Sequence, residues 1–146
     1  MSATRLPGKP LLKINNQSII SHVVKKAQEA KIGKVVVCTE NEEIKEDVEK
    51  NGGEAILTNN FHKTGTDRIF EGLTKLNLKN LDYILNLQGD EPDIDKKDII
   101  NLNNFMIKSD SDIGTLGAEI KDNLIFSKRN VVKVKAGGKT VLNKSQ

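Results

Sequence analysis

The segment Lys34-Val35-Val36-Val37-Cys38-Thr39 is a short, continuous and largely β-branched run in a chain of 146 residues. Such a run is typical of a strand that is buried on both faces of a parallel sheet. Before it, apolar residues recur at helical spacing from Ser18 to Lys31, with Asn16 or Ser18 as the candidate N-cap. After it, Asn41 is predicted to cap a second helix, which runs to about Asn51.

The pattern of alternating strands and helices continues along the chain. The sequence predicts a strand over Glu54–Thr58, a helix that Thr66 caps, a strand over Tyr83–Leu87, a helix that Asp95 caps, a strand over Asp112–Ile120, and a hairpin of Val131–Lys135 with Thr140–Leu142. Strands that alternate with helices indicate βαβ units, and therefore an α/β fold with a mainly parallel sheet. Ligands bind beyond the carboxyl ends of the strands in such sheets.

Composition excludes several classes of protein. The chain is 36% hydrophobic, and no run of about 18 apolar residues is present to span a bilayer. Its one cysteine, Cys38, rules out an internal disulfide and a cysteine-based zinc site. The net charge of +3, from 23 basic and 20 acidic residues, is too balanced for a nucleic-acid-binding protein. The start of the chain lacks an apolar signal core, so we expect a cytoplasmic protein without nucleic-acid or membrane partners.

The loop Arg5-Leu6-Pro7-Gly8-Lys9-Pro10 is the first candidate site. Arg5 and Lys9 bring two cations into one bend, which suits a polyphosphate, and Gly8 permits close approach of a ligand to the backbone. The loop is not a Walker A motif, because Pro10 follows Lys9 and the upstream glycine is missing. The alternative is an ordinary surface turn with solvated cations.

The second candidate is Gln88-Gly89-Asp90-Glu91-Pro92, at the carboxyl end of a predicted strand. Its carboxylates could hold Mg²⁺ through one side chain, water molecules and substrate phosphates. The alternative is an acidic turn that ends the strand.

The third candidate is His62-Lys63-Thr64-Gly65-Thr66-Asp67-Arg68, where Thr66 and Asp67 resemble the cap and first turn of a helix. Arg68 would contact a ligand or pair with Asp67 or Glu71. Structural roles are favoured for the other reactive side chains of the chain: a solvated loop residue for His62, a surface or half-buried helix residue for His22, and a small buried hydrophobe for Cys38.

Four segments, in this order along the chain, closely resemble 3-deoxy-manno-octulosonate cytidylyltransferase, the CMP-Kdo synthetase family of lipopolysaccharide synthesis. They are Ser2–Leu11, Ile19–Val23, Thr64–Arg68 and Asn86–Pro92. The resemblance implies a Rossmann-like nucleotidyltransferase fold, a three-layer α/β sandwich. It also implies transfer of a cytidylyl group from CTP to Kdo with Mg²⁺, in a homodimer. Two alternatives are a nucleotidyltransferase for another sugar acid, such as sialic acid, and a non-catalytic CTP-binding module.

Carried over motif by motif, the resemblance gives catalytic roles to Arg5 and Lys9, on the CTP phosphates, and to Asp90, as the Mg²⁺ ligand. Gly8, Thr66, Arg68 and Gln88 would bind the nucleotide or the sugar acid, with the Thr66–Arg68 segment near the cytidine and Gln88 near the acid.

The resemblance also leads us to expect that residues 1–146 are a partial cytidylyltransferase domain, truncated at both ends. The family's first strand would precede Met1, and Asn130-Val131-Val132-Lys133-Val134 resembles a family strand after which little matches. A second metal-binding Asp, most contacts to the sugar acid and much of the dimer interface would then be missing. We therefore expect weak or absent activity of the chain alone.

Overall fold

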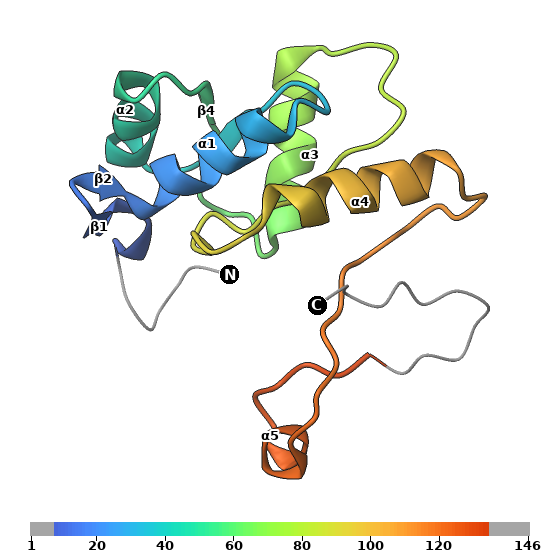
Figure 1. The fold of residues 1–146 in the computed structure, drawn as a ribbon. Coiled ribbons are helices and arrows are strands. Elements are labelled where there is room, and N and C mark those ends of the chain that lie inside the picture. The colour runs from blue at the N-terminus through green and yellow to red at the C-terminus, as the bar shows by residue number, and fades with distance from the viewer. Residues whose placement is uncertain (1–7, 135–146) are drawn as a thin grey trace.

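The computed structural model describes residues 8–134 of the chain. In chain order its elements are η1 (Lys9–Leu11), β1 (Lys13–Ile14), β2 (Gln17–Ser18), α1 (Ile19–Ala30), β3 (Val37–Thr39), α2 (Glu42–Lys50), β4 (Ala55–Leu57), α3 (Gly65–Leu76), α4 (Lys96–Ile107) and α5 (Asn123–Ser127). The predicted helices and the first two predicted strands are thus present (Figure 1). The α/β class is confirmed.

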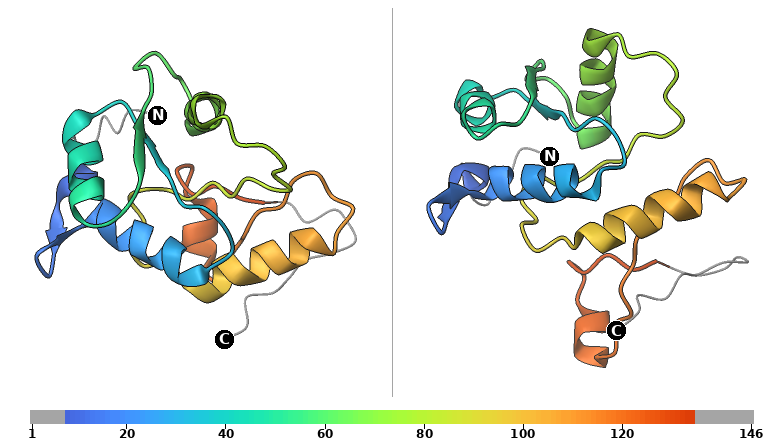
Figure 2. Two further views of the ribbon diagram at one scale, coloured as in Figure 1. Left: turned by 90° about the horizontal axis from the view of Figure 1, so that it is seen from above. Right: turned by 45° about the horizontal axis from the view of Figure 1, so that its top comes forward.

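The β3–β4 pair forms the middle layer of the fold. The two strands are parallel, with Val37 opposite Ala55 and Cys38 opposite Ile56. Successive side chains of a strand point to opposite faces. Val37 and Ala55 accordingly pack against the α1–α2 core, whereas Cys38 and Ile56 meet α3. Helices therefore cover both faces of the strand pair (Figure 2), as the predicted three-layer sandwich requires.

The core on the α1–α2 face is small and apolar. Ile20 and Val24 of α1 pack there with Val48 of α2, whose side chain is only 1% exposed. Burial of each such side chain contributes about 1.5–3 kcal/mol to folding. The helical spacing predicted from the sequence places Ile20 and Val24 on one face of α1. Helix α4, which carries the buried Ile99, packs against α1 as well.

The start of the described chain is a tight turn followed by a short hairpin. Gly8 has a φ of 77°, a left-handed conformation that favours glycine, and η1 follows at once. The β1–β2 hairpin turns through Asn15 and Asn16, with φ of 49° and 65°. Asn is among the few residues that tolerate this backbone. Asn16 is thus a turn residue, and Ser18 caps α1 by accepting a hydrogen bond from the Ser21 N–H at 3.2 Å.

Two predicted strands are wrong. Tyr83–Leu87 and Asp112–Ile120 are not strands in the structure. Along the first segment Leu85 and Leu87 are half-buried while their neighbours are exposed, as in a strand covered on one side. A strand also needs a backbone partner, and the described residues supply no ladder there. Of the predicted hairpin, residues 131–134 are not a strand, and the rest lies outside the described residues.

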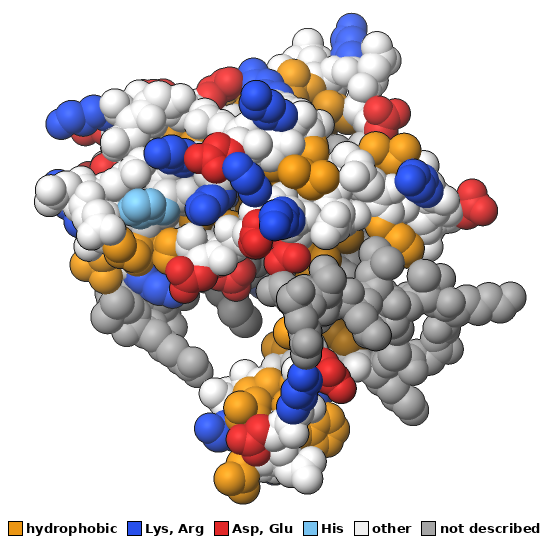
Figure 3. All heavy atoms as spheres, viewed as in Figure 1, with side chains coloured by type: hydrophobic (Ala, Val, Ile, Leu, Met, Phe, Trp, Pro, Cys, Tyr) orange, Lys and Arg blue, Asp and Glu red, His pale blue; other side chains and the backbone are white. Residues whose placement is uncertain are grey.

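The last described segment carries its apolar side chains on the surface. In α5, Leu124 is 74% exposed and Phe126 is 57% exposed, and hydrophobic side chains gather on this part of the molecule in Figure 3. Elsewhere on the face in Figure 3, basic and acidic side chains are interspersed. Among residues 8–134, no helix is both long enough and apolar enough to cross a membrane.

Gly72 sets how closely α3 can approach β3, which yields a stability prediction. A Cβ at Gly72 would lie 2.3 Å from Cys38 Sγ. Gly72→Ala should therefore lower the free energy of unfolding by about 1–3 kcal/mol, although alanine is normally the better helix residue by about 1 kcal/mol. Chemical denaturation measures the change.

The control is Gly33→Ala, because nothing lies within 4 Å of a Cβ at that position. In a Cys38→Ala background the steric conflict disappears, and Gly72→Ala should become neutral or stabilising. Equal effects of Gly72→Ala in both backgrounds would contradict this account of the contact.

Candidate functional site

The carboxyl ends of β3 and β4 lie side by side. The Thr58 N–H donates to the Thr39 carbonyl at 2.8 Å, which extends the strand pairing to the edge of the sheet. Both threonines are buried. The polar segments that follow, beginning at Glu40 and Asn59, therefore leave the sheet at the same edge, as the sequence predicts for these two strands.

Arg68 of α3 joins these two strand ends. Its Nη1 donates to Thr58 Oγ1 at 2.7 Å and to the Asn59 carbonyl at 3.2 Å, while Nη2 forms an ion pair with Glu40. The side chain is only 18% exposed. The sequence predicts a ligand contact or a pair with Asp67 or Glu71. The structure gives the guanidinium protein partners at the sheet edge, and its ionic partner is Glu40.

The start of α3 corrects one prediction. The N-cap is Thr64, whose Oγ1 accepts from the Asp67 N–H at 3.1 Å and donates to Asp67 Oδ2 at 2.6 Å. Thr66 is therefore the second helical residue, exposed at the surface. Thr64 and Asp67 form a reciprocal pair akin to a capping box, which the sequence spacing Thr-x-x-Asp could have revealed.

Glu71, one turn after Arg68, collects hydrogen bonds from the loop after β4. Its carboxylate accepts from the Asn59 N–H at 3.0 and 3.1 Å, from Asn59 Nδ2 at 3.0 Å, and from His62 Nε2. Lys75 Nζ lies 2.7 Å away on the next turn. These donors, Lys75 above all, lower the pKa of Glu71 to about 2. His62 is thus paired and only 11% exposed, not solvated as the sequence suggests.

A cavity of about 560 Å³ opens beside this loop. Its lining comes from the loop and from the first two turns of α3: Phe61, His62, Lys63, Thr66, Asp67, Phe70 and Glu71. The two phenylalanines are each 70% exposed. Exposed rings beside charged groups can contact the flat face of an aromatic ligand while polar groups bind its edge.

The first two sequence motifs meet through an ion pair. Lys9 Nζ lies 2.8 Å from Asp90 Oδ2, although 81 residues separate them in sequence. Both side chains are partly exposed, at 38% and 41%. The sequence places both residues in one site, and the structure brings them together. Arg5 lies outside the described residues.

Packing at the start of α1 explains why these two loops meet. The Ile19 N–H donates to the Leu12 carbonyl at 2.9 Å, so the chain after η1 is tied to α1. Gly89 sits against Ile20, where a Cβ would lie 2.8 Å from the Ile20 Cδ1 atom. Gln88 is exposed beside it. Within residues 8–134, no hydrogen bond or ion pair joins Arg68 to Lys9 or Asp90.

The donor set at Asp90 fits one kind of metal ion. Among residues 8–134, no three His, Cys, Asp or Glu side chains gather as a metal cluster. This excludes a closed, all-protein metal cage in that part of the chain. Mg²⁺ is commonly held by one or two carboxylates, with water and substrate phosphates completing the shell. Asp90 is partly exposed and can serve as such a single carboxylate.

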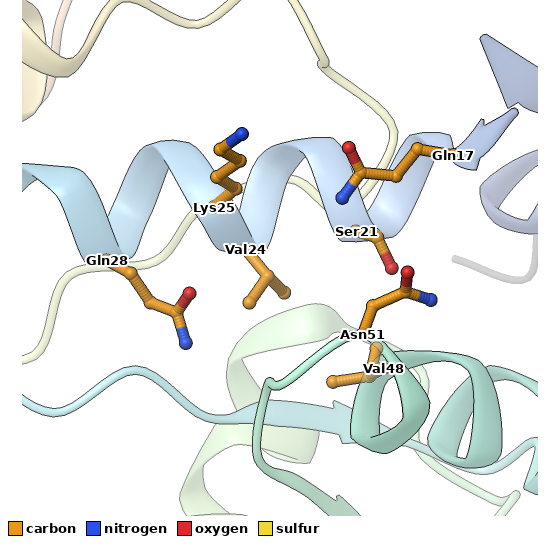
Figure 4. Close-up of a pocket in the computed structure, with 7 residues that line it drawn as sticks. All are labelled: Gln17, Ser21, Val24, Lys25, Gln28, Val48 and Asn51. Carbon is orange, nitrogen blue, oxygen red and sulfur yellow. The ribbon is translucent and has the colours of Figure 1, made fainter. Parts of the chain in front are cut away.

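A second pocket, of about 320 Å³, lies between α1 and α2 (Figure 4). It is lined by Gln17, Ser21, Val24, Lys25, Gln28, Val48 and Asn51. Near it, Ser21 Oγ donates to Asp47 Oδ2 at 2.9 Å. These side chains come from β2, from α1 and from the end of α2, so the sequence does not mark them as a site.

His22 and Cys38 have structural roles, as the sequence predicts. His22 Nε2 lies 2.9 Å from the Ile14 carbonyl oxygen and so links α1 to the hairpin. Burial raises the pKa of the Cys38 thiol, with Arg68 opposing the shift. A thiol with a raised pKa is a poor nucleophile.

Comparison with known proteins connects this chain to an enzyme family. The model of the cytidylyltransferase family matches residues 1–140. The 3-deoxy-manno-octulosonate cytidylyltransferase of Chelativorans sp. (strain BNC1) is 42% identical over 135 residues, and that of Nitrobacter winogradskyi is 44% identical over 134 residues. These alignments cover 92% and 91% of this chain, and 54% and 53% of those relatives. The chain spans about half the length of the curated relatives it matches.

One solved structure is similar as well. It is a CMP:2-keto-3-deoxy-manno-octonic acid synthetase in complex with CTP, with a TM-score of 0.67 and 40% identity. The match covers 72% of this chain and 43% of that protein.

The hydrogen bonds around Glu71 predict its titration. Because its pKa is lowered to about 2 from the usual 4.5, the folded state favours the carboxylate. Its contribution to stability is complete above about pH 4.5 and is lost as the pH falls towards about 2. Carbon-13 NMR of the Glu71 carboxyl group measures this directly. Lys75→Gln, which removes the largest cause, should raise the pKa. A midpoint near 4.5 in the unvaried chain would contradict the hydrogen-bonded geometry.

Proposed function

The chain belongs to the cytidylyltransferase family, and from that premise we propose that it acts in the transfer of a cytidylyl group from CTP to 3-deoxy-D-manno-octulosonate (Kdo). The products are CMP-Kdo, for lipopolysaccharide synthesis, and pyrophosphate. The observation that carries the proposal is the contact of Lys9 with Asp90, at 2.8 Å. This contact supports the proposal, because a cation that could bind phosphate lies beside a carboxylate of the kind that holds Mg²⁺. The curated relatives named above carry this activity in their names.

The proposed reaction is a displacement at phosphorus. A hydroxyl oxygen of Kdo forms a bond to the α-phosphorus of CTP, the bond from that phosphorus to the bridging oxygen breaks, and pyrophosphate leaves with the electron pair. The hydroxyl proton goes to solvent. Such transfers depend on positioning and on neutralising charge more than on covalent catalysis. Lys9 would supply positive charge at the phosphates and Asp90 would hold the metal ion.

Magnesium would bind through Asp90 together with phosphate oxygens of the nucleotide. Bound there, Mg²⁺ supplies charge neutralisation at the phosphates. In the nucleotide-free chain, Asp90 is paired with Lys9. Metal binding at Asp90 would free Lys9 for the phosphates, so the metal ion and the nucleotide would assist each other's binding.

The remaining site residues are proposed from the family motifs. Arg5 would join Lys9 on the phosphates, and Gly8 would let them approach the backbone. Thr66, exposed on the first turn of α3, would contact the nucleotide, and Gln88, exposed beside Asp90, would face the sugar acid. Arg68 would act at the edge of the nucleotide site while it holds the strand ends. For the whole family enzyme we propose a homodimer in the cytoplasm, with much of the dimer interface outside residues 1–146.

Calorimetry with CTP and a pyrophosphate-release assay test the proposal together. Binding of CTP with Mg²⁺, and pyrophosphate release that requires Kdo, would support it. Release with sialic acid in place of Kdo would indicate a different acceptor. CTP binding without release from either acid is the outcome expected for a partial domain and equally for a non-catalytic binding module. The absence of CTP binding would contradict the proposal.

If Lys9 leaves Asp90 to bind the phosphates, Asp90→Asn should change the affinity for CTP and its dependence on Mg²⁺. The substitution removes a negative charge beside the triphosphate and frees Lys9. Metal-free CTP should bind several-fold more tightly than it binds the unvaried chain, and added Mg²⁺ should no longer strengthen binding. Calorimetry with and without Mg²⁺ gives both values.

Glu91→Gln is the matched control, because it removes the neighbouring carboxylate and leaves the Lys9–Asp90 pair intact. It should keep the Mg²⁺ effect. An Asp90→Asn variant that still binds CTP more tightly with Mg²⁺ would refute the metal assignment.

A further inference from the structure

Two side chains of α3 hold the loop between β4 and α3 at the backbone of Asn59. Arg68 donates to the Asn59 carbonyl at 3.2 Å, and Glu71 accepts from the Asn59 N–H at 3.0 Å. Both side chains come from α3, three residues apart, so they lie on the same face of the helix. Charge-assisted hydrogen bonds of this kind are among the stronger ones in proteins. The backbone of Asn59 is therefore fixed to α3, and not only to the strand before it.

Glu71 also fixes the next part of the loop through His62. The two side chains are paired and both are largely shielded, with 11% of His62 and 14% of Glu71 exposed. His62 and Glu71 are in addition two of the side chains that line the cavity of about 560 Å³, together with Thr66. One carboxylate thus sets the backbone at the start of the loop, and through His62 it sets one wall of the cavity.

We propose that Glu71 is a positioning residue for nucleotide binding. It holds Asn59 and His62 so that the cavity wall beside Thr66 is preformed when CTP arrives. The inference rests on the proposed function, because that function puts the nucleotide beside Thr66. Nothing requires Glu71 to touch the ligand: it acts through Asn59 and His62. A preformed wall spares the ligand the entropic cost of ordering the loop.

Glu71→Gln tests the proposal with two readouts. The amide is the same shape as the carboxylate, but it lacks the charge and turns an NH₂ group towards the loop donors. Hydrogen exchange at the Asn59 amide should become faster, while exchange within α1 and α2 stays unchanged. The dissociation constant for CTP with Mg²⁺ should rise about five- to ten-fold, as for the loss of a hydrogen bond to a charged group.

Two variants of His62 test whether Glu71 acts through this side chain in CTP binding. His62→Gln keeps an N–H donor for Glu71 and should bind CTP within about two-fold of the unvaried chain, whereas His62→Leu removes the donor and should bind several-fold more weakly. If Glu71→Gln fails to fold, this pair still tests the inference. Glu46→Gln, an exposed acid on α2, is the control for a change of charge alone.

The outcomes separate this inference from the proposed function. Faster exchange at Asn59 together with weaker CTP binding supports the inference. Unchanged exchange, or unchanged CTP affinity despite faster exchange, overturns it and leaves the proposed function standing. If the unvaried chain binds no CTP, the proposed function fails and the nucleotide part of the inference fails with it. The exchange data then still decide whether Glu71 holds the loop.

Discussion

The parallel pairing of β3 with β4 is the constraint on which the candidate site depends. Parallel strands end at the same edge, so the residues that follow each strand emerge as neighbours. The register of Thr39 against Leu57 places Glu40 within reach of the same guanidinium that contacts Thr58. A slip of one residue would exchange the faces of each strand. It would also turn Val37 away from the core, so the core and the site are fixed by the same pairing.

The charged side chains of the candidate site form two groups that serve different purposes. In the first group, Arg68 pairs with Glu40 after β3, and Glu71 accepts from Asn59 after β4. These contacts fasten the loops that follow the two strands to α3. Lys9 and Asp90 instead form one partly exposed pair, which a phosphate and a metal ion can replace. A site that binds a highly charged nucleotide benefits from both arrangements. Arg68 and Glu71, whose side chains are 18% and 14% exposed, hold the geometry of the loop, whereas in the proposed function the Lys9–Asp90 pair would exchange its partners.

Sequence patterns predicted the local features of this structure better than the distant ones. Helix spacing and the buried run before Thr39 depend on neighbouring residues, so α1, α2, β3 and β4 were predicted. The hairpin through Asn15 was missed, although an Asn-Asn turn carries the signal. The predicted strand over Tyr83–Leu87 is wrong, because a mostly apolar run reports burial and not the presence of a hydrogen-bonded partner strand.

In the candidate site, too, contacts within a motif were easier to predict than contacts between distant segments. The family resemblance predicts that the motifs containing Lys9 and Asp90 share one site, and the structure joins these two side chains in an ion pair. The partners of Arg68 and of Glu71 could not be predicted, because Glu40 and Asn59 become neighbours of α3 only after the strands pair. The cap at Thr64 was misassigned to Thr66 by two residues, since both threonines fit the local pattern and only the hydrogen bond to Asp67 distinguishes them.

Mapping the CTP site by amide chemical shifts, with Mg²⁺ present, tests the central claim most directly. The account predicts that the largest shifts fall at Gly8–Lys9, at Gln88–Asp90 and along the loop from Asn59 to Thr66. Shifts confined to the pocket between α1 and α2, around Gln28 and Asn51, would contradict it.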